Sequence, residues 1–104
     1  NYRLGHYDWS LFFYHLTLEK LFKGLIIKNA QVPPPVHDLS KLAKIAKVTL
    51  TQQHSDYLKE ITTYNIEARY DDYKQSFYKK ATKIYTRKWI NICEEIFLWL
   101  RKMF

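Results

Sequence analysis

Charged side chains in the first apolar stretch of this 104-residue chain stand at spacings that could bind a phosphate group. Glu19 and Lys23 are four residues apart, and on an exposed helix they would form an ion pair worth roughly 0.3–0.5 kcal/mol. Lys20 and Lys23 could instead point into a groove where their ammonium groups meet phosphate while Glu19 holds the geometry. The sequence leaves both interpretations open.

Two histidines lie close to these charges in the sequence. His37 follows three prolines and precedes Asp38. Its imidazole could bind an anion at a helix start, where free amides favour negative charge, or it could make only a local hydrogen bond within the turn. His15 lies on an apolar stripe, so we expect it to be partly buried and hydrogen-bonded rather than a ligand.

Arg69 is the strongest single candidate, because its planar fork can hold a phosphate or a carboxylate through two hydrogen bonds. Tyr70 beside it offers a stacking surface, and Lys74 follows shortly after. The alternative is an internal salt bridge that fixes the turn, from Arg69 to Asp71, Asp72 or Glu67.

Basic and aromatic residues alternate between Tyr73 and Trp89. Basic groups beside aromatic platforms are typical of proteins that bind single-stranded nucleic acid. Tyrosines at helical spacing also cover the edges of cores, and lysines on the opposite side are often only solvated. The residues concerned are Lys74, Lys79, Lys80, Lys83, Arg87 and Lys88, with Tyr73, Tyr78 and Tyr85.

Metal chemistry and cysteine chemistry are not indicated. No two histidines and acids stand at metal-ligand spacing, so we expect no metal and no cofactor. Cys93 is the only cysteine, so it cannot form an internal disulfide, and it lies in an apolar helical pattern. We therefore expect Cys93 to pack in the core rather than to act as a nucleophile.

Composition predicts one soluble helical domain over residues 1–104. Apolar residues make up 47%, enough for one core, and two Gly and three Pro are few for many short strands. No apolar run reaches the roughly 18 residues of a membrane span, and no cleavable signal is visible, so we expect a cytoplasmic protein outside the membrane. The formal charge of +7 attracts anions such as nucleic acid or nucleotide phosphates.

Apolar spacing and turn residues predict four helices. The first runs from residue 8 to about residue 29, and its apolar surface is wider than one core-facing seam, which indicates a second packing surface and hence a dimer. Asp38 can cap a short second helix, and Thr51 can cap a third that ends near Arg69. The Asp71–Asp72 pair then marks a break and can cap a long last helix that reaches the C-terminus.

Four segments on these elements follow one another in an order known from one protein family. The first segment is Asp8-Trp9 with the Glu-Lys-x-x-Lys core of His15–Leu25, and the second is the proline-rich turn and His-Asp-Leu start of Pro34–Leu39. The third is the Ala-Arg-Tyr signature of Asn65–Tyr70, with Asp71 where Pro is usual. The fourth is the Tyr-rich terminal helix. On these segments, which span about Tyr7 to Phe104, the chain resembles the HEPN domain family.

The resemblance implies an all-α four-helix up-and-down bundle, usually a homodimer, that binds nucleotides or RNA. Members are often encoded beside, or fused to, a minimal nucleotidyltransferase, and some such pairs behave as toxin and antitoxin. Catalytic members are metal-independent ribonucleases in which an Arg is followed, after four to six residues, by a His. No arginine of this chain has a histidine at that spacing, which holds for Arg3, Arg69, Arg87 and Arg101.

Three hypotheses follow. The first is a non-catalytic, homodimeric HEPN module whose basic cleft binds nucleotide or RNA. The second is a diverged ribonuclease or toxin, with Arg69 stabilising the phosphate and His37 transferring protons. The third is an interaction module whose apolar first helix docks a nucleotidyltransferase or a second copy. The residues predicted to bind the ligand in the first hypothesis are Lys20, Lys23, His37, Arg69, Tyr70 and Lys74.

Overall fold

The computed structural model describes residues 5–104, and every regular element in that part of the chain is a helix. The elements are α1 (His6–Lys28), α2 (Leu39–Ile45), α3 (Gln52–Arg69), α4 (Asp71–Lys80) and α5 (Lys83–Arg101). The predicted all-α fold class is therefore confirmed. Arg3, one of the arginines tested for the ribonuclease spacing, lies outside the described residues.

Local sequence signals start α2 and α3. Pro33–Pro35 lack amide donors, so the connector that follows α1 cannot continue as a helix. The Asp38 side chain accepts a hydrogen bond from the Lys41 amide at 3.2 Å, where α2 begins. The Thr51 side chain accepts one from the His54 amide at 3.1 Å, where α3 begins. Both predicted caps are confirmed.

The prediction of one long last helix is wrong, because the structure divides it into α4 and α5. At Thr82 the backbone is extended, with φ −68° and ψ 166°, and the Thr82 side chain accepts a hydrogen bond from the Tyr85 amide at 3.2 Å. This contact caps α5. The Asp71–Asp72 pair lies in the first turn of α4 rather than capping it, since Tyr70 is the residue before the helix. The described chain thus has five helices rather than four.

Replacing Thr82 with Ala is expected to lower the free energy of unfolding by about 1 kcal/mol, because the Tyr85 amide loses its acceptor. The matched control is Thr82→Ser, which keeps the oxygen and should stay within about 0.5 kcal/mol of the wild type. Urea unfolding followed by circular dichroism measures both variants. Equal stability of all three proteins would mean that other contacts hold the break between α4 and α5.

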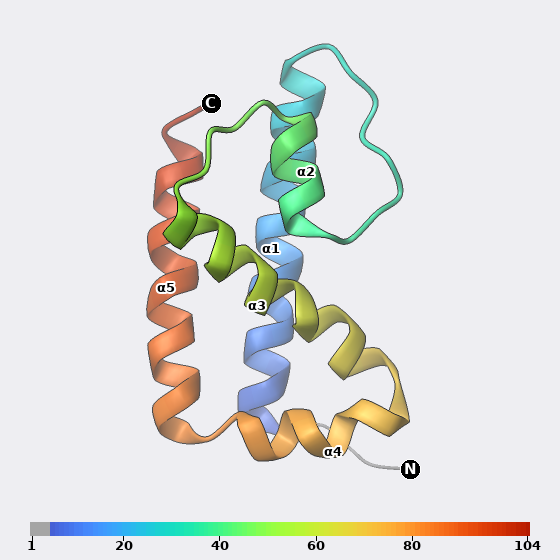
Figure 1. Ribbon diagram of the computed structural model, residues 1–104, viewed down its shortest axis with the longest axis vertical. Coiled ribbons are helices and arrows are strands. Elements are labelled where there is room, and N and C mark those ends of the chain that lie inside the picture. Colours follow the sequence, from blue (N-terminus) through green and yellow to red (C-terminus); the bar gives the residue numbers. More distant parts are fainter. Residues whose placement is uncertain (1–4) are drawn as a thin grey trace.

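Figure 1 shows α1 and α5 side by side, with the start of each at the lower end of the view. Helix α3 crosses in front of them on a diagonal, α4 lies across their lower end, and α2 packs against the later half of α1. The helices α1, α2 and α5 therefore run in the same general direction. The predicted simple alternation of up and down helices is therefore wrong. The connector after α1 leads the chain back down before α2 begins, and α3 with α4 leads it back to the lower end before α5 begins.

A continuous apolar core holds α1 against α2, α3 and α5. Burying one Leu or Phe side chain contributes roughly 1.5–3 kcal/mol, so the middle of α1 is firmly placed. The same buried stripe of α1 carries three polar residues, Asp8, His15 and Glu19. The largest fully buried side chains include Leu11, Leu18, Phe22, Ile26, Leu39, Leu42, Leu58, Ile61, Tyr64, Phe77 and Leu100.

Candidate functional site

Glu19 is the centre of a polar group on α1, which we name the Glu19 cluster (His15, Glu19, Lys23 and His37). Its Oε2 accepts a hydrogen bond from Lys23 Nζ at 3.0 Å, and its Oε1 accepts one from His37 Nδ1 at 3.0 Å. Lys23 follows Glu19 by one turn of α1, whereas His37 belongs to the connector between α1 and α2. Glu19 is only 7% exposed, so protein groups rather than solvent satisfy its carboxylate.

Two contacts fix His37 beside α1. Its backbone carbonyl accepts a hydrogen bond from His15 Nε2 at 3.0 Å, and its ring Nδ1 donates to Glu19, because a carboxylate only accepts. The side chain of His37 is 42% exposed, and its Nε2 is the ring nitrogen left for a ligand. His37 can therefore donate or accept a hydrogen bond at Nε2 according to its protonation.

His15 is fully buried, deeper than the partial burial that we predicted. Its Nε2 donates to the His37 carbonyl, while its Nδ1 has no hydrogen-bond partner and lies 3.9 Å from Glu19 Oε1. Burial lowers the pKa of His15 below its ordinary 6.5, although the hydrogen bond and the charge of Glu19 act in the opposite direction. His15 is therefore neutral at pH 7 and supports the connector rather than a ligand.

The pKa of Glu19 lies below its ordinary value of 4.5. Burial alone raises this pKa, but the hydrogen bonds and positive charges of Lys23 and His37 together outweigh it. Glu19 is therefore ionised at neutral pH and balances the charge of Lys23.

Arg69 ends α3 at the edge of this cluster, and its Nε donates to Asn65 Oδ1 at 2.9 Å. Its positive charge contributes to the lowered pKa of His15, after the larger effect of burial, so the two side chains lie within electrostatic range. In the part of the chain that the structure describes, Arg69 forms no ion pair. The alternative of an internal salt bridge to Asp71, Asp72 or Glu67 is therefore wrong.

The other three predicted site residues do not join the Glu19 cluster. Lys20 is exposed on α1 and contacts no other polar group among the described residues. Tyr70 stands between α3 and α4 and is 59% exposed. Lys74 forms an ion pair with Asp71 at 3.1 Å inside α4. Of the six residues proposed from the sequence, the structure joins Lys23 and His37 through Glu19, and Arg69 lies within electrostatic range of His15.

A second polar group, which sequence reasoning missed, joins α3 to α4 and α5; we name it the Lys80 network (Glu60, Tyr64, Glu67, Lys80 and Tyr85). Lys80 Nζ lies 2.5 Å from Glu67 Oε1 and 3.3 Å from Glu60 Oε2. The hydroxyl of Tyr85 donates to Glu60, and the two tyrosine hydroxyls are hydrogen-bonded at 2.7 Å. Burial is the main cause that raises the pKa of both tyrosines, so both stay protonated.

The contacts of the Lys80 network bear on how part of the basic and aromatic stretch between Tyr73 and Trp89 is interpreted. Lys80 and Tyr85 hold helices together, which supports the structural interpretation for these two residues. One sequence signal points to part of the network. Glu60 and Glu67 are seven residues apart, which places two carboxylates on one side of α3, but this spacing does not identify the cation that pairs with them.

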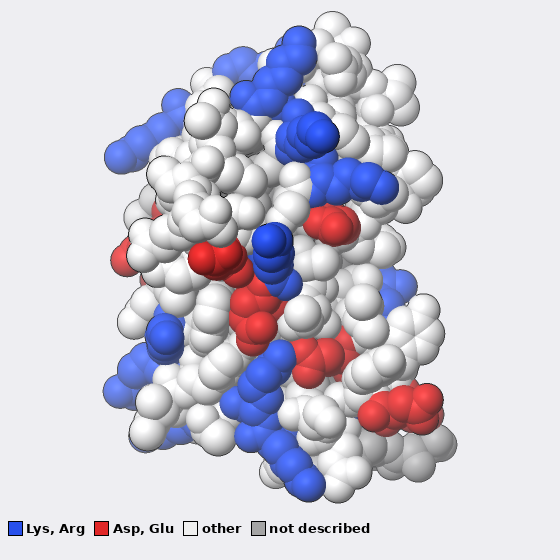
Figure 2. Space-filling model, viewed as in Figure 1, with Lys and Arg blue, Asp and Glu red and all other residues white. Residues whose placement is uncertain are grey.

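The positive charge is not spread evenly. Figure 2 shows that on the face crossed by α3, acidic side chains gather across the middle, between lysines and arginines toward the two ends. The net charge of +7 therefore does not form one continuous basic surface on this face.

Three further observations bear on chemistry. Within residues 5–104, no group of three or more His, Cys, Asp or Glu side chains could hold a metal ion. None of the described helices combines the length and the apolar character that crossing a membrane requires. Cys93 is fully buried in α5, and burial raises the pKa of its thiol to about 12, so the expected packing role is confirmed.

Comparison with known proteins gives one match. Residues 1–103 match the family model of the HEPN domain. Neither the curated proteins nor the solved structures gave a match. The family match spans almost the whole chain and agrees with its all-helical fold. The chain therefore belongs to the HEPN domain family.

Proposed function

We propose that this HEPN domain binds a nucleotide or RNA at the surface where Arg69 borders the Glu19 cluster. Membership of the family supports a nucleotide- or RNA-related function. One observation carries the choice of site: Arg69 is exposed at the end of α3, and none of the described carboxylates pairs with it. An arginine with that freedom is suited to an external anion.

The charges around Arg69 favour phosphate over other ligands. Glu19 and Lys23 balance each other, so the charge of Arg69 is not cancelled within the cluster. The guanidinium can hold two phosphate oxygens through parallel hydrogen bonds, and His37 Nε2 can donate a further one when the ring is protonated. The site therefore offers binding groups, and we assign no catalytic residue to it.

Replacing Arg69 with Ala is expected to weaken binding of ATP or a short single-stranded RNA by about tenfold, because a charge-assisted hydrogen bond contributes roughly 1.5–3 kcal/mol. The matched control is Lys20→Ala, which removes the same charge from an exposed position of α1 outside the cluster and should change affinity by less than about twofold. Fluorescence anisotropy with labelled ligands measures the dissociation constants.

Arg69→Lys separates charge from geometry, because it keeps the charge and loses the planar fork. An affinity between those of the wild type and Arg69→Ala would support two-point phosphate binding. If Lys20→Ala weakens binding as much as Arg69→Ala does, the ligand responds only to total charge and the proposed site is wrong.

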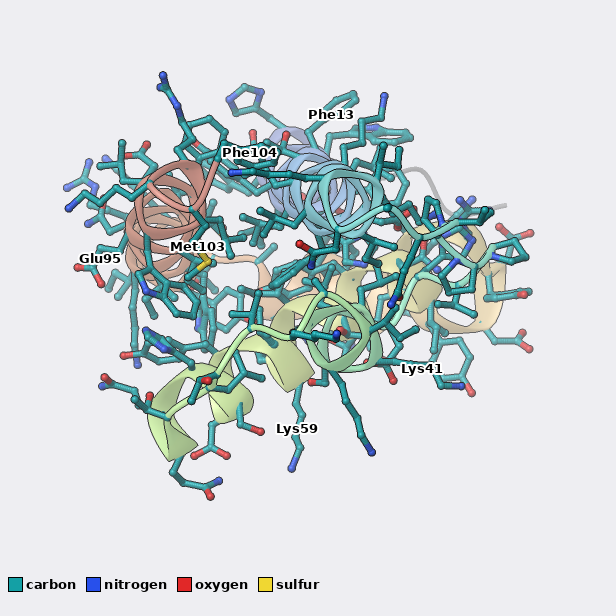
Figure 3. The ribbon with its side chains drawn as sticks, turned by 90° about the horizontal axis from the view of Figure 1, so that it is seen from above. Phe13, Lys41, Lys59, Glu95, Met103 and Phe104 are labelled. Carbon is teal, nitrogen blue, oxygen red and sulfur yellow. The ribbon has the colours of Figure 1, made fainter. Side chains whose placement is uncertain are left out.

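We also propose that the domain forms a homodimer through the side of α1 and α5 turned away from α3. Figure 3 shows Phe13 and Phe104 on one side of the molecule, with Lys41 and Lys59 on the other. Phe13 is 60% exposed, and its ring stacks on that of Trp9, which is 44% exposed, at 5.9 Å between ring centres. Neighbouring exposed aromatic side chains are typical of protein interfaces.

Phe13→Glu is expected to convert the dimer to a monomer, because a charge would be buried at the interface without a partner. Ile66→Glu is the matched control, since Ile66 is also an exposed apolar residue but lies on α3. Size-exclusion chromatography with light scattering gives the mass of each protein. A monomeric wild type, or a dimer that survives Phe13→Glu, would contradict this interface.

A diverged metal-independent ribonuclease or toxin is the second candidate, and the Glu19–His37 pair is the observation that favours it. A carboxylate that accepts from Nδ1 orients an imidazole so that Nε2 can transfer protons, and Arg69 would stabilise charge on the phosphate. Incubating single-stranded RNA with the wild type and with His37→Ala, in the presence of a chelator, tests this candidate. Cleavage lost only in the variant would establish it.

The family resemblance suggests the setting of this activity. We propose that residues 1–104 act as one cytoplasmic domain beside a minimal nucleotidyltransferase, in a pair of the toxin–antitoxin kind. The exposed aromatic side chains of α1 also suit docking of such a partner. Co-purification of the two proteins, with and without Phe13→Glu, would separate this use of the surface from dimerisation.

A further inference from the structure

A groove between the N-terminal ends of α1 and α5 lies apart from the Glu19 cluster and shares no residue with it. Its wall contains two cations and several hydrogen-bonding groups, and no Asp or Glu lines it. A groove with that lining favours an anion. The residues on which the argument rests are His6, Ser10, Lys83, Thr86, Arg87 and Asn91.

The two cations of the groove are available to a ligand. Lys83 and Arg87 are four residues apart on α5, so they lie on one side of the helix. Neither forms an ion pair in the part of the chain that the structure describes. Three other cations of the same stretch have partners: Asp71 for Lys74, Glu67 for Lys80 and the Trp89 ring, at 5.9 Å, for Lys88. Lys79 is exposed and has no ion pair among the described residues, but it does not line the groove.

Thr86 gives a second, independent indication of a ligand. It lines the groove, is only 2% exposed, and its hydroxyl has no hydrogen-bond partner. A buried hydroxyl without a partner is unfavourable, and a threonine in a helix has two accessible side-chain rotamers. The hydroxyl can therefore turn to an acceptor that enters the groove between Lys83 and Arg87.

We propose that this groove binds a phosphate group, carried either by an RNA strand or by a free nucleotide. Arg87 supplies the fork for two phosphate oxygens and Lys83 a further positive charge. Asn91 and Ser10, one on each wall, supply neutral hydrogen-bonding groups. The proposal rests on these residues alone and does not depend on what binds beside Arg69.

Nuclear magnetic resonance of the ¹⁵N-labelled protein tests the site with three probes: inorganic phosphate, uridine monophosphate and a single-stranded hexauridylate. Each probe is expected to shift the backbone amides of Thr86, Arg87 and Asn91. Tighter binding of hexauridylate than of the monophosphate identifies an RNA strand as the source, and the reverse order identifies a free nucleotide. Absence of shifts at these amides with all three probes overturns the proposal.

Arg87→Gln and Lys88→Gln form the matched pair, because they remove the same charge from adjacent positions of which only Arg87 lines the groove. Arg87→Gln is expected to weaken phosphate binding about tenfold, as loss of a charge-assisted hydrogen bond requires, and Lys88→Gln less than about twofold. Equal losses in both variants overturn the proposal, because they show a response to surface charge alone.

Thr86→Val tests the buried hydroxyl while keeping the size of the side chain. Phosphate binding is expected to weaken about threefold, with stability unchanged or increased, because the variant removes a donor that has no partner in the protein. Unchanged affinity with reduced stability would overturn the part assigned to Thr86.

The Arg69→Ala protein tests whether the groove binds phosphate independently of the surface beside the Glu19 cluster. Its groove amides should shift as in the wild type, whatever happens to binding beside the Glu19 cluster. Loss of the groove shifts in Arg69→Ala would show that the two surfaces are one site and would overturn the inference of a separate one.

Discussion

Replacing Lys80 with Met is expected to lower the free energy of unfolding by about 2–3 kcal/mol, because it leaves two carboxylates close together without their cation. Glu67 is the more buried of the two, with 14% of its side chain exposed. This expected loss is smaller than the loss from breaking a fully buried ion pair, because Lys80 keeps 29% of its side chain exposed. Chemical unfolding of the wild type and the variant gives the difference.

Two further proteins show whether the loss belongs to the Lys80 network. Lys79→Met removes a neighbouring exposed lysine and should change stability by less than about 0.5 kcal/mol. The double variant with Lys80→Met and Glu67→Gln should recover a large part of the loss, because one unpaired charge is gone. Equal effects of Lys79→Met and Lys80→Met would contradict a structural role of the network.

Replacing Glu19 with Ala is expected to cost about 2 kcal/mol of stability at pH 7, since two charge-assisted hydrogen bonds to a nearly buried carboxylate are lost. The partial exposure of Lys23 and His37 keeps the loss below the sum of two such bonds. Glu19→Gln keeps the shape of the side chain and an acceptor for His37, so this variant should lose less stability than Glu19→Ala. Thermal or urea unfolding of the three proteins measures these differences.

The loss caused by Glu19→Ala should depend on pH in one direction. Because the pKa of Glu19 is lower in the folded than in the unfolded protein, its stabilisation is fully present above about pH 4.5. That stabilisation disappears as the pH falls through the folded pKa, so wild type and variant should converge in acid. A difference that stays constant down to pH 3 would contradict the lowered pKa.

The starts of α2 and α3 could be predicted from the sequence because their caps depend on neighbouring residues only. Asp38 and Thr51 act through amides three residues away, and both caps are present. The cap at Thr82 could not be predicted in the same way, because apolar residues at helical spacing continue past it. Phe77 is buried, whereas Ile84, seven residues further on, which would lie on the same side of one continuous helix, is 85% exposed. The helix phase therefore changes at the break, and only packing reveals it.

The sequence named six candidate ligand residues, but it could not say which of them the fold would place near Glu19. Lys23 and His37 are far apart in the chain, and they meet only because the connector after α1 folds back onto Glu19. Lys20 is a neighbour of Glu19 in sequence but lies on the exposed side of α1. Side-chain direction on a helix, which spacing alone constrains only loosely, decides between such neighbours.

The Lys80 network shows a different limit of sequence reasoning. Its members come from α3, from the end of α4 and from α5, so no local pattern contains them. Lysines and tyrosines at helical spacing suit nucleic acid and a polar core edge equally well. Only the position of Glu60 and Glu67 opposite Lys80 separates the two interpretations.

Calorimetry is the most direct test of whether this HEPN domain binds a nucleotide or RNA. ATP and a short single-stranded RNA would be titrated separately into the wild-type protein at two salt concentrations, and the recovered RNA inspected on a gel. At least one ligand is expected to bind, and to bind more weakly at high salt, because phosphate contacts release counterions. The RNA is expected to remain intact. No heat and no binding with either ligand at low salt would contradict it.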